Sequence, residues 1–499
     1  MTASSQPHPS RRSVVTTGLV GAGLLTLGVP GHASAGAATA PIRVSPQRRL
    51  RTMEGWGTAL SWGANIIGGW ADVDARTEIV DLLFDPRRGL GLNSTRYNIG
   101  ATENPSHDHM RLGSTIPSFW PERPGEWDDT QDARQRWVLE EAIARGVDRV
   151  SSFVSSPHYW WTRSGCTAGA ADGGDNLLPE HLDDYAAYLV DVVTLFRRRW
   201  DITIDSLTPL NEPAASWWKA MGRQEGCGYS RPYQAEVLTA VGRALADAGL
   251  DGDTLLSMPE EWAPSWTLDT VDDYDADDVA AYLGLVSTHS YGDDAPRDDL
   301  RGWAHERGLP IEMAEYGTPG DAGYEPQHVT NALNLARRLN QDLRQLQPDT
   351  WTIWNAVESI EENSVADTCW GLIHASYTAG TERFYVAKQY YGFANYVRFI
   401  RPGFTLVDIG DPDAVAAYDE RTRRLVIVYV SYDDADRTVT FDLSAFASPA
   451  GMVKRARTSA TENLARLRPE RYHHHAYSTT IKGSSITSFE FPGMPLRHS

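Results

Sequence analysis

Residues 180–212 read EHLDDYAAYLVDVVTLFRRRWDITIDSLTPLNE and contain a helical pattern followed directly by a strand pattern. Between Glu180 and Arg199, apolar side chains recur at steps of three and four residues: Tyr185, Leu189, Val192, Val193 and Phe196. This spacing predicts an amphipathic helix. The β-rich run Ile204–Leu210 predicts a strand that ends just before Asn211-Glu212. The stretch therefore reads as one helix and one strand of a repeating βα unit.

The same alternation extends through most of the chain, with further helical patterns over Tyr233–Ala248 and His328–Leu346. The candidate strands are Glu54–Leu60, Leu92–Ile99, Val150–Ser155, Ile204–Leu210, Thr254–Pro259, Leu283–Ser290, Ile311–Tyr316 and Thr350–Ala356. This pattern predicts an α/β protein with a (β/α)₈ TIM barrel, whose active site lies at the carboxyl ends of the strands. A doubly wound open sheet is the alternative fold. No G-x-G-x-x-G follows a strand, so a dinucleotide site is not indicated.

From about residue 400 onward the sequence contains short strand patterns separated by turn residues. These patterns cover Phe404–Asp408, Ala414–Tyr418, Leu425–Tyr432, Thr438–Leu443 and Ser485–Phe491. Because no helical pattern intervenes, we expect a small C-terminal antiparallel β-sandwich side domain. The barrel is placed at residues 51–385, and a linking helix with the sandwich at 386–499.

Residues 1–35 have the three parts of an export signal peptide. Arg11-Arg12 precedes an apolar stretch from Val14 to Val29, and Ala33-Ser34-Ala35 supplies a small-residue cleavage pattern. An arginine pair before a weakly hydrophobic stretch favours twin-arginine export, and an ordinary Sec signal is the alternative. We expect a secreted, extracellular protein that makes no membrane contact after signal cleavage.

The composition excludes several classes of partner. The 499 residues carry a formal net charge of −20, from 46 Lys+Arg against 66 Asp+Glu. This acidic balance argues against a nucleic-acid partner and against a polybasic membrane contact. The 17 tryptophans are suggestive, because flat aromatic faces suit sugar rings, although packing in the core is the ordinary reading of any single one.

The three cysteines allow one disulfide and one free thiol in an exported protein. Cys166 and Cys227 both lie in glycine-rich loops and are the favoured pair, and Cys369 is not excluded as a partner. No spacing of Cys and His is typical of a zinc site, so no metal is expected.

Two carboxylates stand at predicted strand ends. Glu212 follows the fourth strand in TPLNEP, and Glu315 ends the seventh in IEMAEYG. In a barrel these ends meet at one mouth, where paired carboxyls suit glycoside hydrolysis. A separation of about 5–5.5 Å would indicate retention of anomeric configuration, and about 6.5–9.5 Å inversion. A salt bridge at the barrel rim is the alternative reading of each residue.

The chain resembles the clan A retaining glycoside hydrolases, and within them glycoside hydrolase family 30. The resemblance lies in Asn211-Glu212, in Glu315 and in the motifs GWGTALSW (55–62), LNSTRYNIG (92–100), SSPHYW (155–160), YYGF (390–393) and FIRPG (399–403). It implies that Glu212 is the acid/base, that Glu315 is the nucleophile and that no metal or organic cofactor takes part. It also implies that residues 36–50 form a leader and a strand, near Ile42–Leu50, that joins the side domain.

Within the family, Trp217-Trp218 followed by RQEGC (223–227) is similar to the endo-β-1,6-galactanase branch, whose members cut β-1,6-galactan side chains of arabinogalactan proteins. This implies a polysaccharide or oligosaccharide substrate, and we expect a monomer. The alternatives are another family 30 specificity, namely a β-1,6-glucanase, a glucosylceramidase-like β-glucosidase or a xylanase. A non-catalytic carbohydrate-binding protein is the alternative from another class.

Several neighbours of the two carboxylates have hypothetical roles. Asn211 would donate to the sugar 2-hydroxyl, and Arg96 would hold Glu315 ionised, with a structural ion pair as the alternative. His289 and Tyr291 stand at the end of the sixth predicted strand, and Tyr291 would hydrogen-bond Glu315. The remaining substrate-binding candidates, each of which could instead belong to the core or the rim, are Trp354, Trp56, Trp62, Trp160, Trp217 and Glu260.

Overall fold

The computed structural model describes residues 40–122, 126–275, 278–292, 296–447 and 449–497. Residues Pro41–Ser499 form one compact unit. The predicted export signal at residues 1–35 lies outside the described residues, and so does most of the predicted leader.

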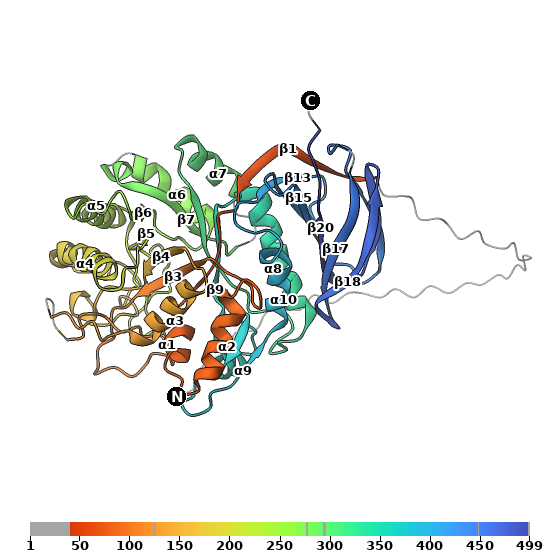
Figure 1. Ribbon diagram of the computed structural model, residues 1–499. Coiled ribbons are helices and arrows are strands. Elements are labelled where there is room, and N and C mark those ends of the chain that lie inside the picture. The colour runs from red at the N-terminus through yellow and green to blue at the C-terminus, as the bar shows by residue number, and fades with distance from the viewer. Residues whose placement is uncertain (1–39, 123–125, 276–277, 293–295, 448, 498–499) are drawn as a thin grey trace, which may run out of the picture. The chain divides into compact units, whose positions relative to one another are not determined.

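Eight parallel strands close into a barrel in sequence order, which confirms the predicted TIM barrel (Figure 1). They are β2 (Gly55–Ala59), β3 (Ser94–Ile99), β4 (Arg149–Val154), β5 (Ser206–Thr208), β6 (Leu255–Ser257), β7 (Leu283–His289), β8 (Ile311–Tyr316) and β9 (Thr350–Asn355). Each predicted strand overlaps one of these. The strands are almost wholly buried because helices cover their outer face, although many of their buried side chains are polar.

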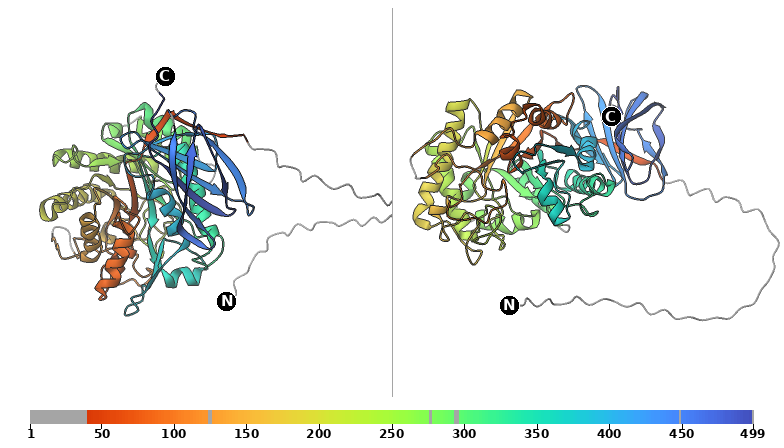
Figure 2. Two further views of the ribbon diagram at one scale, coloured as in Figure 1. Left: turned by 45° about the vertical axis from the view of Figure 1, so that its right-hand side comes forward. Right: turned by 90° about the horizontal axis from the view of Figure 1, so that it is seen from below.

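Helices follow the strands and surround the barrel in Figures 1 and 2. They are the short α1 (Gly63–Ile67) and the longer α2 (Val73–Phe84), α3 (Ala133–Ala144), α4 (Leu182–Trp200), α5 (Arg231–Asp247), α6 (Pro264–Asp275), α7 (Arg297–Glu306) and α8 (Val329–Gln341). In α4, the predicted apolar face is buried. Acidic residues in its first turn and three arginines in its last turn complement the helix dipole.

A small subdomain follows the barrel. Strands β10 (Val357–Ser359), β11 (Ile373–Ala375) and β12 (Phe384–Val386) form a three-stranded sheet, and α9 (Ile360–Ala366) connects the first two. This segment starts directly after β9, so it stands at the carboxyl end of the barrel strands and adds side chains to that mouth.

Eight C-terminal strands and the N-terminal β1 (Ile42–Thr52) form the side domain. The C-terminal strands are β13 (Thr405–Ile409), β14 (Ala414–Asp419), β15 (Arg424–Ser431), β16 (Arg437–Asp442), β17 (Ala450–Ser459), β18 (Glu462–His473), β19 (Ala476–Ile481) and β20 (Ser485–Phe491). All pairings are antiparallel except that of β1 with β16. The antiparallel side domain and its N-terminal strand agree with the prediction, whereas β17–β19 were not predicted.

The helix α10 (Lys388–Val397) joins the two parts (Figure 1). It packs against α8 on one side and against β17, β18 and β20 on the other. Its Lys388 Nζ donates to the carbonyl oxygen of Ser459 at 3.1 Å, and its Asn395 donates to Thr458 Oγ1 at 2.6 Å. One hydrophobic core runs from the barrel through α10 to this side of the sandwich, which supports the barrel from outside.

The cysteines differ from the prediction, because all three are buried free thiols and the Cys166–Cys227 disulfide is not formed. The Cys227 thiol points to the carbonyl oxygen of Gly228, while the Cys166 thiol faces Glu103.

Among the described residues, no helix is long and apolar enough to cross a membrane.

Glu312 on β8 is a buried carboxyl inside the barrel and gives a test of the fold. It accepts a hydrogen bond from Ser151 Oγ at 3.1 Å. Burial, aided by the negative charge of Glu260, raises the pKa of Glu312 to about 7. A carboxyl whose pKa is raised on folding favours the folded state only while it is protonated. The stability of the folded state therefore decreases as the pH rises through about 7 and Glu312 ionises.

Glutamine cannot ionise, so Glu312→Gln should be more stable relative to wild type at pH 8 than at pH 5. We expect the difference in free energy of unfolding between variant and wild type to be about 3 kcal/mol larger at pH 8. Urea denaturation at the two pH values measures this difference. Glu54→Gln removes a carboxylate that is exposed to solvent and controls for the loss of one charge. Equal effects of Glu312→Gln at both pH values would contradict the assignment.

Candidate active site

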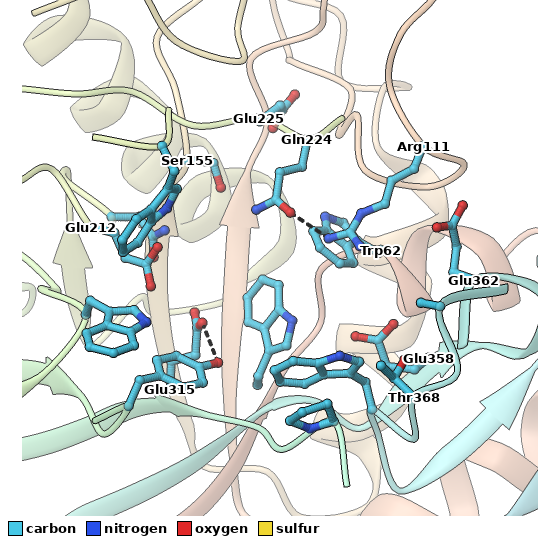
Figure 3. Close-up of a pocket in the computed structure, with 18 of the residues that line it drawn as sticks. Trp62, Arg111, Ser155, Glu212, Gln224, Glu225, Glu315, Glu358, Glu362 and Thr368 are labelled. Carbon is cyan, nitrogen blue, oxygen red and sulfur yellow. Dashed lines mark hydrogen bonds between the residues drawn. The ribbon is translucent and has the colours of Figure 1, made fainter. Parts of the chain in front are cut away.

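A cavity of about 580 Å³ opens at the carboxyl ends of the barrel strands (Figure 3). Seven predicted site residues line it: Trp62, Asn211, Glu212, Trp217, Tyr291, Glu315 and Trp354. Glu212 and Glu315 lie on the same side of the view in Figure 3, with their carboxylates toward one another. The strand ends thus bring together residues that are far apart in the sequence.

A β-bulge in β8 directs Glu315 into the cavity. His289 and Thr288 are consecutive on β7, yet they pair with Glu315 and Met313 on β8, so one extra residue lies on β8 at this point. Side chains alternate along a regular strand, and therefore Glu312 and Glu315 would point to opposite faces without this extra residue. The bulge allows both carboxyls to face the barrel interior.

Two hydrogen-bond donors and one further cation surround the Glu315 carboxylate. Arg96 Nη1 donates to Oε2 at 3.0 Å, and the Tyr291 hydroxyl donates to Oε1 at 3.0 Å. His289 Nε2 lies 3.5 Å from Oε2. Burial raises the pKa of Glu315, and the positive charges of His289 and Arg96 oppose this rise. Burial outweighs these two cations and the pKa of Glu315 stays above its ordinary value, while Arg96 and Tyr291 hold the carboxyl by hydrogen bonds.

Glu212 is held at the end of β5 by backbone contacts. Its φ is 47°, in the left-handed region that costs energy for a residue with a side chain. The Glu212 amide donates to the carbonyl of Glu260 at 2.8 Å, and the Trp218 indole donates to the Glu212 carbonyl at 2.9 Å. His289 Nδ1 lies 3.0 Å from Glu212 Oε1. These contacts fix the strained residue with its carboxyl toward the cavity.

A buried charge network lies beneath the two carboxylates. Arg96 contacts Glu260 and Glu315 and donates to Asn211 Oδ1 at 2.8 Å. Burial alone would raise the pKa of Glu260, but Arg96 and His289 outweigh it and hold this pKa at about 2. Burial alone would lower the pKa of His289, but the surrounding carboxylates raise it to about 9. Arg96 and His289 are therefore both cations at neutral pH.

The separation of the two carboxylates is short. One oxygen of Glu212 and one of Glu315 lie within 4.8 Å of one another, and His289 lies beside both. These three side chains are close enough to hold a metal ion. Both ring nitrogens of His289 face carboxylates, so the ring bridges Glu212 and Glu315 through ion pairs.

Comparison of the chain with models of protein families shows which family it belongs to. The O-glycosyl hydrolase family 30 profile matches residues 39–365. The chain belongs to glycoside hydrolase family 30. This agrees with the resemblance seen in the sequence motifs, and it makes the chain a glycosidase that acts on a carbohydrate substrate.

Relatives of this family 30 enzyme have several descriptions. An endo-beta-1,6-galactanase from Hypocrea rufa is 26% identical over 488 residues, which cover 91% of this chain and 95% of that protein. An exo-beta-1,6-galactobiohydrolase from Bifidobacterium longum subsp. longum is 21% identical over 80% of this chain and 35% of that protein. The crystal structure of a conserved exported protein from Bacteroides fragilis shares the fold with a TM-score of 0.76, at 20% identity over 90% of this chain and 100% of that one.

Five predicted site residues do not line the cavity of the family 30 enzyme. Arg96 and His289 are fully buried beneath the carboxylates, where they contact Glu315 and do not reach a ligand. Glu260 is also buried, and it neutralises Arg96 instead of offering its carboxylate to a sugar hydroxyl. The contact of Arg96 with Glu315 is the one expected from the sequence, whereas His289 and Glu260 lie beneath the cavity and not on its wall.

The two other residues are tryptophans predicted to stack on sugar. Trp56 packs against Trp351 and Phe393 in the core, and its indole donates to the carbonyl of Ile400 at 2.7 Å. It has no exposed surface and cannot be a sugar platform. Trp160 is partly exposed, but it packs against His158 with 4.5 Å between ring centroids and does not line the described cavity.

Sequence reasoning missed part of the cavity wall. Arg111, in the loop after β3, lies over the ring of Trp62 at 3.7 Å and donates to Gln224 Oε1 at 2.6 Å. Trp262 stacks on Tyr291, with 5.9 Å between ring centroids. Both are supplied by connections after strands, where helical or strand periodicity gives no signal. Only the general rule that barrel sites lie on such loops could have pointed to them.

The pKa of His289 leads to a prediction about pH dependence. The acidic limb of kcat/KM reports the carboxyl that must be ionised in the free enzyme. Replacing His289 with Gln removes a cation beside Glu315, which favours the protonated carboxyl and raises its pKa. We therefore expect the acidic limb of His289→Gln to lie at higher pH than that of wild type.

The measurement is the pH profile of kcat/KM on an accepted glycoside. His158→Gln is the matched control, because His158 is also buried but burial lowers its pKa to about 3, so it carries no charge at working pH. Its acidic limb should coincide with that of wild type. A limb that stays in place or moves to lower pH in His289→Gln would refute the electrostatic role.

Proposed function

We propose that this family 30 enzyme is an exported retaining hydrolase that cleaves β-1,6-galactosyl linkages in the side chains of arabinogalactans. The short carboxylate separation carries the mechanistic part of the proposal. Oxygens of Glu212 and Glu315 that lie within 4.8 Å suit direct attack by one carboxylate, whereas an inverting enzyme needs about 6.5–9.5 Å to accommodate a water.

The surroundings of the two carboxylates support distinct roles. Glu315 is the nucleophile, because Arg96, Tyr291 and His289 all stabilise its anion. Its carboxylate attacks the anomeric carbon while the bond to the leaving oxygen breaks and Glu212 protonates that oxygen. Glu212 then takes a proton from water, which attacks the covalent glycosyl-enzyme and releases Glu315.

Asn211 and the tryptophans supply substrate contacts in this scheme. Arg96 donates to Asn211 Oδ1, so the Asn211 amide nitrogen is the group left to bind the sugar 2-hydroxyl. Trp354 and Trp62 meet edge to face at 5.2 Å on one side of the cavity. Trp217 is 46% exposed and offers a ring face to a longer chain.

The galactan specificity rests on the relatives. The protein described as an endo-beta-1,6-galactanase aligns with nearly the whole chain, and a second relative is described as acting on β-1,6-linked galactobiose units. The segment Trp217-Trp218 and residues 223–227, which is similar to that branch, lines the cavity through Trp217, Trp218, Gln224 and Glu225. Export is supported by the signal pattern in residues 1–35 and by the exported relative from Bacteroides fragilis.

Release of reducing sugar from four substrates tests the specificity. We expect activity on de-arabinosylated arabinogalactan and on β-1,6-galactan, with little on β-1,6-glucan or xylan. Sizing of early products distinguishes internal cleavage, which gives a range of oligomers, from release of galactobiose alone. Activity confined to glucan or xylan would overturn the galactanase proposal while leaving the family unchanged.

Isosteric variants test the two roles. We expect Glu315→Gln to lose almost all turnover, and Glu212→Gln to lose about 10²–10⁴-fold in kcat on natural substrate because general acid–base catalysis is removed. With an aryl galactoside whose leaving group needs no proton, azide should restore turnover of Glu212→Gln and give a β-galactosyl azide. Glu312→Gln, earlier on β8 and outside the cavity lining, is the control and should retain most activity.

An α-galactosyl azide from Glu212→Gln, or azide rescue with retention in Glu315→Gln, would reverse the two roles. Wild-type rates in either variant would refute the catalytic assignment altogether.

A further inference from the structure

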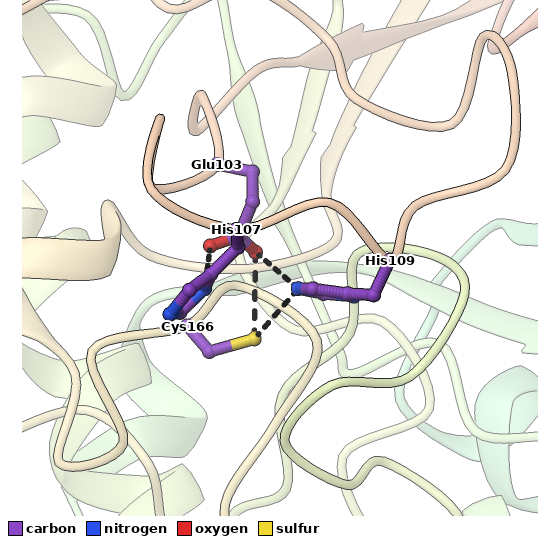
Figure 4. Close-up of side chains that lie close together, drawn as sticks. All are labelled: Glu103, His107, His109 and Cys166. Atoms are coloured by element: carbon purple, nitrogen blue, oxygen red, sulfur yellow. Dashed lines mark hydrogen bonds and ion pairs between the residues drawn. The ribbon is translucent and has the colours of Figure 1, made fainter.

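Four metal-binding side chains converge outside the catalytic pair. Glu103, His107 and His109 lie in the loop after β3, and Cys166 lies in the loop after β4 (Figure 4). One ligand atom from each lies within 4.8 Å of the others. The catalytic scheme does not use this group, which is called the Cys166 cluster below.

Two of its distances match the edges of a zinc tetrahedron, and a third is slightly longer. Cys166 Sγ lies 3.5 Å from His109 Nε2 and 3.4 Å from Glu103 Oε2, and the latter two atoms are 3.7 Å apart. Bonds of about 2.3 Å to sulfur and about 2.0–2.2 Å to nitrogen and oxygen at tetrahedral angles give edges of about 3.4–3.6 Å. A Zn²⁺ ion therefore fits above this triangle without rearrangement of the loops.

The tautomer of His109 suits a ligand. Its Nδ1 contacts the carbonyl oxygen of Gly222, an atom that can only accept a hydrogen bond, so Nδ1 carries the proton. In the neutral ring the Nε2 lone pair then faces Cys166 and Glu103. A backbone carbonyl that holds the distant ring nitrogen is the usual outer partner of a metal-bound histidine.

Glu103 is held in place in a similar way. Its Oε2 accepts from the Thr167 amide at 2.8 Å and from Thr167 Oγ1 at 2.6 Å, and its Oε1 accepts from the Asn104 amide at 2.7 Å. These three hydrogen bonds fix the direction of the Glu103 carboxylate.

His107 closes the group on the side of solvent. Its Nδ1 lies 3.0 Å from Glu103 Oε1, and its side chain is 22% exposed, whereas the other three ligands are nearly buried. A small rotation of this ring would provide the fourth ligand, and its exposed edge provides a path for the ion.

We infer that the Cys166 cluster binds one Zn²⁺ through Cys166, His109, Glu103 and His107. The Cys166 S–H proton goes to solvent when the Zn–S bond forms, so the thiolate and the carboxylate neutralise the ion. Soft and borderline donors of this kind favour zinc over Mg²⁺ or Ca²⁺. All positions are filled by protein, which is typical of a structural site.

The ion would fasten the rim of the sugar cavity. Two residues after His109, the Arg111 amide donates to the carbonyl of Arg223 at 2.9 Å, and the Arg111 side chain binds Gln224. Both Arg111 and Gln224 line the cavity. Zinc would thus join the loop after β3 to the loop after β4 and stabilise this wall.

Zinc binding to the purified, untagged chain tests the inference. After chelator treatment and removal of the chelator, we expect wild type to bind one Zn²⁺ per chain with a Kd at or below about 10⁻⁷ M. Cys166→Ser and His109→Gln should weaken binding at least 100-fold. Cys369→Ser is the matched control, because Cys369 is also a buried free thiol but is not in the cluster, and it should bind like wild type.

The run His473–His475 is the other place where histidines gather, and His474→Asn controls for adventitious binding there. Asparagine suits the positive φ of 66° at this position. This variant should keep the stoichiometric zinc. Loss of zinc from His474→Asn but not from Cys166→Ser would place the ion on the sandwich and overturn the inference.

Two further measurements do not depend on how the variants fold. Wild type loaded with Co²⁺ should show a thiolate-to-cobalt charge-transfer band, which Cys369→Ser retains. Stoichiometric Zn²⁺, but not Mg²⁺ or Ca²⁺, should raise the wild-type Tm by about 2–5 °C. Folded wild type that binds no zinc at micromolar concentration would show that the group is only a hydrogen-bonded cluster.

Discussion

The buried guanidinium of Arg96 is the interaction on which the site depends. It contacts Glu260 and Glu315 and donates to Asn211, so it joins β3 to the ends of β5, β6 and β8. A buried cation without partners would be very costly, and therefore each of these carboxyls has to be where it is for the barrel to close around Arg96. Catalytic geometry and barrel stability thus rest on the same contacts.

The charges of the site balance in one protonation state. Arg96 and His289 supply two positive charges, and Glu260, Glu315 and Glu212 supply up to three negative ones. The buried group is neutral when one of the three carboxyls holds a proton. Arg96 and His289 hold Glu260 ionised, whereas burial raises the pKa of Glu315, so these two buried carboxyls differ in how readily they hold a proton.

The sequence was enough to predict the barrel and the positions of both carboxylates, because short β-rich runs alternate with amphipathic helical patterns and each of the two glutamates stands at the end of such a run. Local irregularities were beyond prediction. Sequence alone does not reveal that the bulge in β8 directs Glu315 inward, nor that Trp56 points to the core on β2. The sequence pattern predicts that a residue stands at the end of a strand. It does not predict the direction in which the side chain of that residue points.

Two other failures have the same physical origin. Strand β18 was missed because it contains three arginines and only one buried residue, and β17 because its burial pattern does not alternate regularly, so neither shows the alternation of a half-buried strand. The Cys166 cluster was missed because its ligands come from two loops and have no zinc-motif spacing. Both features arise from tertiary placement, and neither has a local periodicity.

Part of the strained backbone of the molecule lies at the cavity. Glu212 and Trp62 have positive φ values, and both Glu315 and Trp354 lie at irregular pairings of their strands. Each left-handed residue of this kind costs about 1–3 kcal/mol, so it persists only where the surroundings fix it. Here the fixing contacts are the Arg96 network and the indole of Trp218, with the continuous core behind them. The stability of the regular barrel offsets the strain at the irregular strand ends, and this strain directs the side chains that would contact the sugar.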